Sequence, residues 1–344
     1  MSTGEQASTE PPGLDELLGA MRVVAIPLRV PFRGIDVREV ALIRGPAGWG
    51  EFGPFPEYQP VEAARWLASA IESAYTPWPM PVRHTIAVNA TVPAVTAEQV
   101  PQVLARFDGC TTAKVKVAAP GQDLRADIDR VAAVRATLGP HAQVRVDANG
   151  AWSLAQARQA LTRLAAYDLE YAEQPCGTVE ELAELRMALA RDRIEVPIAA
   201  DESIRRARDP LRVRDLAAAD IVVVKVSPLG GVRAALDVVA QCGLPAVVSS
   251  ALDTSVGIAA GVALAAALPS LEHACGLATV GLFEHDVTLR PLRPVGGMLR
   301  VGRVSPDEAL LERCAPAPER VAWWRRRVAS CHALLRRSAG ELPG

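Results

Sequence analysis

The stretch TTAKVKVAAP, residues 111–120, alternates two kinds of side chain with the period of two that is typical of a β-strand. Lys114 and Lys116 fall on one face of this strand, and Val115 and Val117 fall on the other. If the valines pack against apolar side chains, both ammonium groups point the opposite way, into the space that the strand helps to enclose. Because lysine is almost never fully buried without a partner, we expect an enclosed sheet that directs two lysines at one place.

Strands and amphipathic helices alternate along the chain from about residue 85 to about residue 280. Helical periodicity is clear in SLAQARQALTRLAAY (153–167) and GVRAALDVVAQCG (231–243). The expected strands are TIAVNA (85–90), TAKVKV (112–117), QVRVDA (143–148), EYAEQ (170–174), VPIAAD (196–201), DIVVVKV (220–226), PAVVSS (245–250) and a weaker one at HACGLAT (273–279). Eight strands joined by helices pair in parallel through right-handed crossovers and close into a (β/α)8 barrel. The alternative is an open, doubly wound sheet, but no G-x-G-x-x-G motif follows the first strand.

The segments that flank the barrel have a different pattern and predict a second, α+β domain. Strands are expected at 21–32 and 37–55, and a helix is expected near 61–75. The C-terminal part has no further strand–helix repeat, but WWRRRVASCHALLRR is expected to form a helix that packs back on the N-terminal segment. The predicted organisation is a disordered tail at 1–18, a capping domain formed by 19–84 and about 290–344, and a barrel at 85–289.

Composition and charge argue against several classes of protein. Half of the 344 residues are hydrophobic and the formal net charge is −2, so neither a nucleic-acid binder nor a polybasic membrane protein is expected. The N-terminus, MSTGEQASTEPPG, is too polar for a signal peptide, and no apolar run reaches the ~20 residues that span a bilayer. The six cysteines are far apart without a CxxC pair, which favours a reduced, cytoplasmic protein. Nothing in the sequence determines the oligomeric state.

Charged residues recur at the ends of consecutive expected strands. Asp147 ends VRVD, Glu173 ends EYAE, Asp201 ends PIAAD and Lys225 ends IVVVK. With the two lysines of TAKVKV, charge lies at the C-terminal ends of strands two to six, where barrels carry their active sites. A single strand-end acid more often caps a helix, and a single strand lysine more often reaches solvent. Recurrence on five consecutive strands favours a functional site instead.

The residue types in this set indicate a kind of reaction. Three carboxylates without histidine or cysteine suit a hard cation with oxygen ligands, so Mg²⁺ is expected rather than Zn²⁺. A lysine near that cation and near a second ammonium group has a lowered pKa and can act as a base. Removal of a proton alpha to a carboxylate needs both parts, because the resulting enediolate is unstable unless a cation neutralises it. The expected substrate is therefore a small-molecule carboxylate.

The motifs at these strand ends resemble those of the enolase superfamily, muconate-lactonizing subgroup. They are TAKVKV, VRVDANGAW, YAEQP, AADES and VVKVSPLGG, and the resemblance covers nearly the whole chain. It implies an enolase-like modified TIM barrel with a capping domain, and the lysine-plus-Mg²⁺ chemistry known for that superfamily, with Mn²⁺ as a substitute. Lys116 would take the alpha proton, Lys225 would stabilise the enediolate from the other side of the substrate, and Lys114 would position the substrate carboxylate or tune Lys116. The implied Mg²⁺ ligands are Asp147, Glu173 and Asp201.

Two segments are similar to the actinobacterial o-succinylbenzoate synthases of menaquinone biosynthesis: RVPFRGIDVREVALIRG (29–45) and SSALDTSVGIAAG (249–261). The first resembles that family's mobile capping-domain loop, and Gly34 suits a hinged lid at 29–38. The resemblance implies a lyase that removes water, by syn-dehydration, from 2-succinyl-6-hydroxy-2,4-cyclohexadiene-1-carboxylate (SHCHC) to give 2-succinylbenzoate. Lys116 would return its proton to the departing hydroxyl. Substrate or supporting contacts are implied for Asn149, Glu202, Ser249 and Ser250.

Other activities remain open at this point. N-acylamino acid racemases, dipeptide epimerases and muconate cycloisomerases use the same lysine arrangement, and Lys116 and Lys225 could serve as the two bases of a racemase. Specificity is expected to lie in capping loops at 29–38 and 50–60. The five histidines supply no His–Asp dyad of the mandelate racemase type, and His273 is expected to be structural. A non-catalytic binding relative is disfavoured because every matched metal and lysine position is intact.

Overall fold

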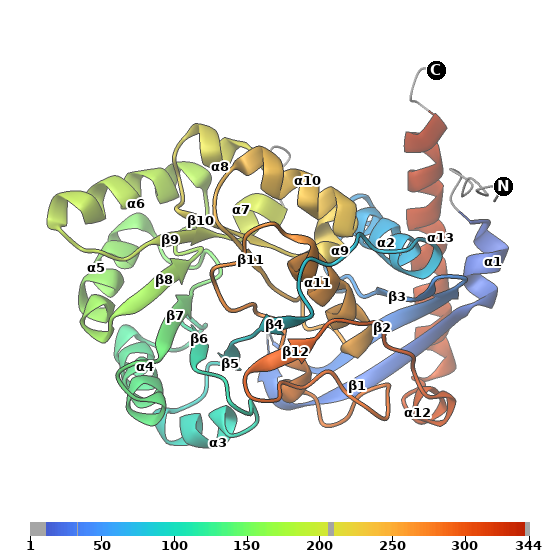
Figure 1. The fold of residues 1–344 in the computed structure, drawn as a ribbon, viewed down its shortest axis with the longest axis horizontal. Helices are drawn as coiled ribbons and strands as arrows, with labels where there is room; N and C mark the ends of the chain where they lie inside the picture. Colours follow the sequence, from blue (N-terminus) through green and yellow to red (C-terminus); the bar gives the residue numbers. More distant parts are fainter. Residues whose placement is uncertain (1–11, 33, 206–209, 341–344) are drawn as a thin grey trace.

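The N- and C-terminal segments of the computed structural model lie together on one side of the barrel (Figure 1). The structure describes residues 12–32, 34–205 and 210–340. A three-stranded antiparallel sheet in the order β1-β2-β3 packs against α2, and α2 packs against the last helix, α13. Trp324 of α13 is fully buried, with its ring 5.7 Å from that of Phe52. The elements of this part are α1 (Leu14–Gly19), β1 (Met21–Phe32), β2 (Ile35–Gly45), β3 (Gly48–Phe52), α2 (Pro60–Tyr75), α12 (Glu308–Arg313) and α13 (Pro318–Gly340).

Residues 14–18, which the sequence predicts to belong to a disordered tail, form most of the helix α1. Leu17 is fully buried, and α1 contacts α13. The prediction is wrong for this part because the surface that buries Leu17 comes from a helix more than 300 residues away along the chain. The rest of the predicted tail, 1–11, lies outside the described residues.

Seven parallel strands form the barrel wall in the order β5-β6-β7-β8-β9-β10-β11. Each pair is joined by a helical connection, as the alternation in the sequence predicts. The strands are β5 (Ala90–Val92), β6 (Thr112–Lys116), β7 (Gln143–Asp147), β8 (Leu169–Glu173), β9 (Ile198–Ala200), β10 (Ile221–Val224) and β11 (Ala246–Val248). The helices are η1 (Ala97–Gln99), α3 (Val100–Leu104), α4 (Leu124–Leu138), α5 (Leu154–Leu164), η2 (Ala165–Tyr167), α6 (Val179–Asp192), α7 (Glu202–Arg205), α8 (Arg212–Asp215), α9 (Val226–Leu229), α10 (Val232–Cys242), α11 (Ser255–Ala267) and η3 (Thr279–Leu282).

The barrel closes between β11 and β5 through single bridges rather than through a full eighth strand. Cys275 bridges Val88, and Gly276 bridges Ser249, both in parallel. The strand expected at 273–279 is therefore reduced to two bridging residues. The helical element directly after it is the short η3. The strand expected at 85–90 is also divided. Its first half is β4 (Thr85–Ala87), which pairs with β12 (Met298–Arg300), while the barrel strand β5 begins at Ala90.

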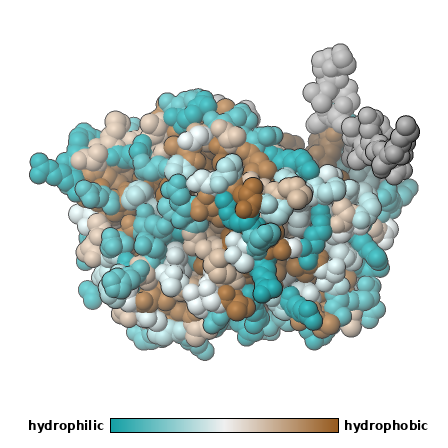
Figure 2. All heavy atoms as spheres, viewed as in Figure 1, coloured by the Kyte–Doolittle hydropathy of each residue, from teal (hydrophilic) through white to brown (hydrophobic). Residues whose placement is uncertain are grey.

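Apolar packing joins the two parts of the molecule. The helix α11 is buried on nearly every side and contacts both the barrel strand β11 and the capping strand β3, which explains its almost uniformly apolar sequence. Hydrophilic and hydrophobic residues are intermixed over the face shown in Figure 2. Within the described ranges, no helix combines the length and the apolar character that crossing a membrane requires.

Candidate active site

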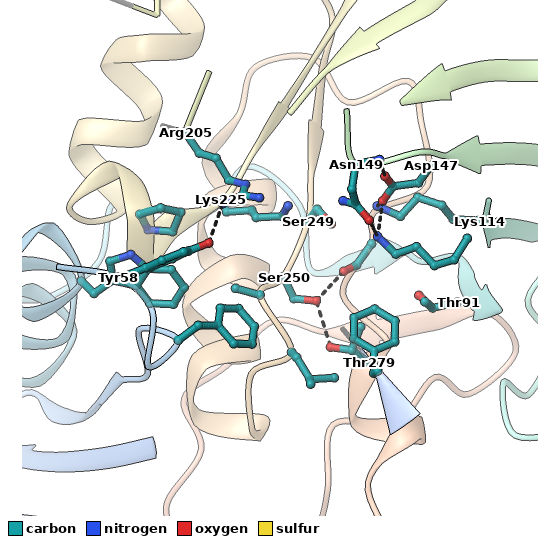
Figure 3. Close-up of a pocket in the computed structure, with 18 residues that line it drawn as sticks. Tyr58, Thr91, Lys114, Asp147, Asn149, Arg205, Lys225, Ser249, Ser250 and Thr279 are labelled. Atoms are coloured by element: carbon teal, nitrogen blue, oxygen red, sulfur yellow. Dashed lines mark hydrogen bonds and ion pairs between the residues drawn. The ribbon is translucent and has the colours of Figure 1, made fainter. Parts of the chain in front are cut away.

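Six charged side chains from five consecutive strands meet at the C-terminal end of the barrel. Figure 3 shows three of them, Lys114, Asp147 and Lys225. Strand register places them side by side, because Lys116 pairs with Asp147 across β6 and β7, and Asp147 pairs with Glu173 across β7 and β8. All six are residues that the sequence singles out: Lys114 and Lys116 on β6, Asp147 and Glu173 as the last residues of β7 and β8, and Asp201 and Lys225 directly after β9 and β10. The structure therefore brings the predicted set into one place.

These three lysines are the only lysines in the 344-residue sequence. Lys114 and Lys225 are 6% and 8% exposed, and the side chain of Lys116 is 15% exposed. A chain that otherwise carries its positive charge on arginine thus keeps every primary side-chain amine inside one pocket. Amines differ from guanidinium groups in that they lose a proton readily when buried, which is a property that acid–base chemistry needs.

Each lysine is paired with a carboxylate. Lys114 Nζ donates to both oxygens of Glu173, at 2.8 and 2.9 Å, and lies 3.5 Å from Asp147 Oδ2. Lys116 Nζ lies 2.5 Å from the same Asp147 oxygen, and Lys225 Nζ lies 2.5 Å from Asp201 Oδ2. Because a buried charge without a partner is very costly, these pairs explain how six charged groups are accommodated in the barrel mouth.

Burial and neighbouring charges shift the pKa values of these groups in different directions. Burial raises the pKa of Glu173, and repulsion by Asp147 adds to this, so that the pKa is about 7. For Asp147 and Asp201, burial is outweighed by the adjacent lysines, which hold the pKa of both carboxyls low, at about 2 for Asp201. The pKa of Lys225 is lowered by burial, whereas at Lys114 burial is outweighed by Glu173 and Asp147, which raise the pKa.

A sharp turn after β7 holds the Asp147 end of the site. Asn149 and Gly150 both have positive φ, 48° and 75°, and the backbone N–H of Asn149 donates to Asp147 Oδ1 at 3.0 Å. Asn149 Oδ1 accepts from Lys116 Nζ at 2.8 Å. Ser153 then caps α5, with Gln156 completing the capping box. The DANG sequence therefore directs both a carboxylate and an amide oxygen toward Lys116.

Two residues that the sequence does not single out fix the Asp201 end. Gln174 Oε1 accepts from the backbone N–H groups of Asp201 and Ser203, at 2.9 and 3.1 Å, and so joins the end of β8 to the end of β9. Arg205 Nε donates to Asp201 Oδ1 at 3.1 Å. Gln174 lies within the motif YAEQP and Arg205 follows AADES by two residues, but their contacts depend on how neighbouring strand ends come together.

The four supporting residues implied by the resemblance lie at different places. Asn149, Ser249 and Ser250 line the pocket. Ser250 Oγ donates to the Gly276 carbonyl at 2.8 Å and lies 2.9 Å from Thr279 Oγ1. Glu202 is set back from the pocket: its Oε1 accepts from Asn149 at 3.3 Å and also pairs with Arg205.

An aromatic wall from the capping domain, formed by Phe32, Phe55, Tyr58 and Trp66, faces the charged strand ends. Tyr58 Oη accepts from Arg205 Nη1 at 2.9 Å, which connects the wall to the barrel. Arg327 of α13 donates to the carbonyls of Phe55 and Tyr58, at 2.8 and 2.7 Å. The last helix of the chain therefore positions part of the pocket wall.

The expected lid residues at 29–38 are held close to the pocket in this structure, although residue 33 lies outside the described residues. Phe32 lines the pocket, with its ring centroid 5.5 Å from Lys116 Nζ. Arg29 donates to the carbonyls of Phe283 and Glu284, both at 2.8 Å. Movement of this segment stays a prediction.

His273 has a structural environment away from the pocket. Its Nδ1 lies 2.7 Å from Glu170 Oε1, and Glu170 also accepts from the buried Arg145 at 2.5 Å. Arg145 Nη1 reaches Asn89 and the Ala274 carbonyl, so this network ties together the barrel interior near the closing bridges.

The donor set fits a hard divalent cation in its chemistry: three carboxylates with no sulfur or imidazole. Glu173 is crowded by Asp147 and Asp201, and a bound cation would relieve this repulsion among the three carboxylates. Their oxygens are at present occupied by lysines, and within the described parts of the chain no three acidic, histidine or cysteine side chains stand in an arrangement that could hold a metal. Binding would require Lys114, Lys116 and Lys225 to release their carboxylates.

Comparison with known families agrees with this geometry. Residues 23–74 match a model described as enolase N-terminal domain-like, and residues 96–307 match one described as enolase C-terminal domain-like. The protein named o-succinylbenzoate synthase from Mycobacterium ulcerans is 59% identical over 332 residues, which cover 96% of this chain and 99% of that protein. The o-succinylbenzoate synthase of Mycolicibacterium smegmatis is 59% identical over 325 residues, covering 94% and 98%. The chain belongs to the o-succinylbenzoate synthase family of enolase-like proteins.

Solved structures share the fold at much lower identity. A muconate lactonizing enzyme from Pseudomonas fluorescens matches with a TM-score of 0.73 at 21% identity, covering 86% of this chain and 98% of that one. An N-succinyl Arg/Lys racemase from Bacillus cereus matches with a TM-score of 0.70 at 19% identity, covering 86% and 96%. These matches confirm the predicted enolase-like barrel with a capping domain.

Proposed function

We propose that this protein is a Mg²⁺-dependent dehydratase that converts SHCHC to 2-succinylbenzoate in menaquinone biosynthesis. The observation that carries the proposal is the pocket itself: Lys116 and Lys225 enter it from different strands, above three carboxylates, in a chain of the o-succinylbenzoate synthase family. The substrate is a carboxylate with an acidic alpha proton and a hydroxyl that can leave. Both lysines reach the place where such a carbon acid would lie.

In this proposal Lys116 performs both proton transfers. As a free amine it takes the alpha proton and becomes an ammonium group, and it then gives that proton to the departing hydroxyl, which leaves as water. One residue can do both only if the proton and the hydroxyl leave from the same face, so the elimination is syn. Asn149, whose amide oxygen accepts from Lys116 Nζ, orients the amine between the two transfers.

Lys225 and Lys114 have supporting roles. Lys225 comes from the end of β10, on another part of the rim, and stabilises the negative charge of the enediolate. Lys114 pairs with Glu173 and lies next to the carboxylate that holds Lys116, so it orients the acids and tunes Lys116. Contact of Lys114 with the substrate carboxylate is the less supported alternative, because its Nζ already donates to both Glu173 oxygens.

Enolase-superfamily enzymes generally use Mg²⁺, and we propose that Asp147, Glu173 and Asp201 hold it here. When bound, the cation supplies charge that stabilises the enediolate dianion. The three carboxylates would hold the cation, and its positive charge would attract the substrate carboxylate toward the lysines. Gln174 and Arg205 keep Asp201 in place while the cation replaces Lys225 as the partner of its carboxylate.

The deciding experiment offers purified protein SHCHC and a panel of N-acylamino acids with Mg²⁺ and compares the kcat/KM values. Dehydration of SHCHC should exceed every racemisation by orders of magnitude. Lys116→Ala removes the base and should abolish both activities, while Arg44→Met, a change of an exposed arginine on the capping strand β2, should leave them unchanged. Turnover of N-acylamino acids with no conversion of SHCHC would refute the proposal.

N-acylamino acid racemisation is a second candidate, favoured by one observation. Lys116 and Lys225 both line the pocket and stand on strands separated by β7, β8 and β9, so each could face one side of a planar intermediate. Exchange of the alpha proton with deuterium from solvent, measured separately in Lys116→Ala and Lys225→Ala, tells whether one or both lysines act as bases.

A further inference from the structure

The turn after β11, residues 250–254, contains a leucine in an unusual backbone conformation. Leu252 has φ of +63°, in the left-handed region that bulky residues rarely adopt. It is only 1% exposed, and it lines the pocket together with Ser250 and Ala251. A left-handed conformation costs a residue with a Cβ about 1–2 kcal/mol, so contacts elsewhere must hold Leu252 in place.

The capping domain supplies the contact. Arg38 of β2 is 1% exposed although it is charged, and its Nε donates to the Leu252 carbonyl at 3.0 Å. Its Nη2 donates to the Gly53 carbonyl and lies 3.4 Å from the Ala251 carbonyl. The guanidinium also lies 4.4 Å from the centre of the Phe55 ring. One side chain of the capping domain thus contacts the turn and the aromatic wall together.

The surroundings of Arg38 leave little room for another arrangement. A Cβ on Gly53 would come within 2.8 Å of Arg38 Nη2, so the guanidinium fills a close-fitting slot. On the other side of the turn, Glu51 accepts from the backbone N–H and the hydroxyl of Thr254, at 3.1 and 2.6 Å. The capping domain therefore holds the turn by two sets of hydrogen bonds, from Arg38 to Leu252 and from Thr254 to Glu51, on either side of Asp253.

We propose that Arg38 is a positioning residue that holds Leu252 in its left-handed conformation and so sets the pocket wall formed by residues 250–252. Arg38 does not line the pocket, and the role proposed for it is exerted through the turn. Substrate binding then depends on a contact between the two parts of the molecule. The chemistry at Lys116 does not depend on it, because that residue is on β6, which does not pair with β11.

The proposal gives a specific kinetic expectation. Without Arg38 the turn relaxes, and the binding-competent conformation becomes rarer by the 5–30-fold that about 1–2 kcal/mol represents. Apparent affinity falls by the same fraction, so KM for SHCHC should rise about 5–30-fold in Arg38→Met, while kcat at saturating substrate stays within about twofold. Loss of global stability would instead lower the active fraction, and with it the apparent kcat.

The decisive test is rescue at Leu252. Glycine adopts positive φ without cost, so in a Leu252→Gly background the turn no longer needs Arg38. Arg38→Met should then raise KM less than about threefold over Leu252→Gly alone. An equal effect of Arg38→Met in both backgrounds would overturn the proposal, and so would an unchanged KM in Arg38→Met. Arg44→Met is the matched control, because it removes an exposed guanidinium from the same strand.

A second measurement needs no substrate and so remains decisive if the proposed reaction is wrong. Amide hydrogen exchange over residues 249–256 should become about 5–30-fold faster in Arg38→Met than in the unmodified protein. It should be nearly the same in Leu252→Gly with and without Arg38. If Arg38→Met does not fold, Arg38→Lys, which keeps the charge but not the planar fork, takes its place with a smaller increase. Unchanged exchange in the folded variant contradicts the proposal.

Discussion

Glu51 offers a quantitative test of how the capping domain is joined to the barrel. Glu51 is 5% exposed, and its carboxyl accepts from Thr254 at the start of α11 and stands near Asp253. Burial raises the pKa of Glu51, and repulsion by Asp253 adds to this, so that the pKa is about 8. We therefore expect Glu51 to be protonated in the folded protein at neutral pH, and Glu51→Gln to be a close neutral substitute.

The size of the effect follows from proton linkage. An unfolded glutamate has a pKa of about 4.3, so between about pH 4.3 and pH 8 the folded state binds up to one proton more than the unfolded state. Stability from this group is complete below the lower value and is lost as pH rises toward the upper one. The slope is at most about 1.4 kcal/mol per pH unit, which amounts to an upper bound of about 5 kcal/mol over the window.

Urea unfolding at a series of pH values from 5 to 9, at constant ionic strength, measures this slope. Glu51→Gln should have a flatter dependence of the free energy of unfolding on pH, and it should be more stable than the unmodified protein at the alkaline end. Glu184→Gln, which changes an exposed carboxyl on α6, controls for the loss of a charge and should run parallel to the unmodified protein. Parallel curves for Glu51→Gln as well would show that Glu51 is ionised in the folded state and refute the reasoning.

Three further predictions concern the reaction. Lys116→Ala should lower kcat/KM by up to about 10⁴-fold, whereas Lys225→Arg, which keeps the charge, should retain measurable dehydration. If alpha-proton exchange survives in Lys116→Ala but disappears in Lys225→Ala, the base is Lys225 on the rim after β10, and its assignment to Lys116 is wrong. EDTA should abolish turnover and Mg²⁺ or Mn²⁺ should restore it, with Asp201→Asn losing most metal affinity in calorimetric titration; full activity in metal-free protein would exclude the metal's role. Residues 29–38 should exchange amide hydrogens faster in free protein than with 2-succinylbenzoate bound, and equal protection would count against a lid.

The barrel and its charged rim could be predicted from the sequence because both depend on local patterns. Alternation in TAKVKV gives the strand and also the common direction of Lys114 and Lys116. Parallel strands share one end, so the residues that end each strand must meet there, whatever the details of packing. The strand pattern and this shared end were enough to predict that Asp147 and Glu173 lie close together.

The features of the fold and of the pocket that could not be predicted depend on contacts between segments far apart in the sequence. HACGLAT looks like a strand, but only Cys275 and Gly276 pair, because the barrel needs no more than two bridges to close. The capping residues that face the pocket carry no local mark that distinguishes them from core aromatics. The left-handed Leu252 is the clearest case, since nothing in its neighbours' sequence calls for positive φ and the contact with Arg38 comes from more than 200 residues away.

The confinement of all three lysines to the pocket has a consequence for spectroscopy and chemical labelling. Protein grown with lysine carrying ¹³C at the ε-carbon should give three side-chain resonances, one each for Lys114, Lys116 and Lys225. Each amine then reports its own titration without mutation, so that the protonation state of each lysine can be followed as cation and product are added. Amine-directed cross-linkers and surface coupling find no exposed lysine on the exterior, so any lysine that they label would report access to the pocket.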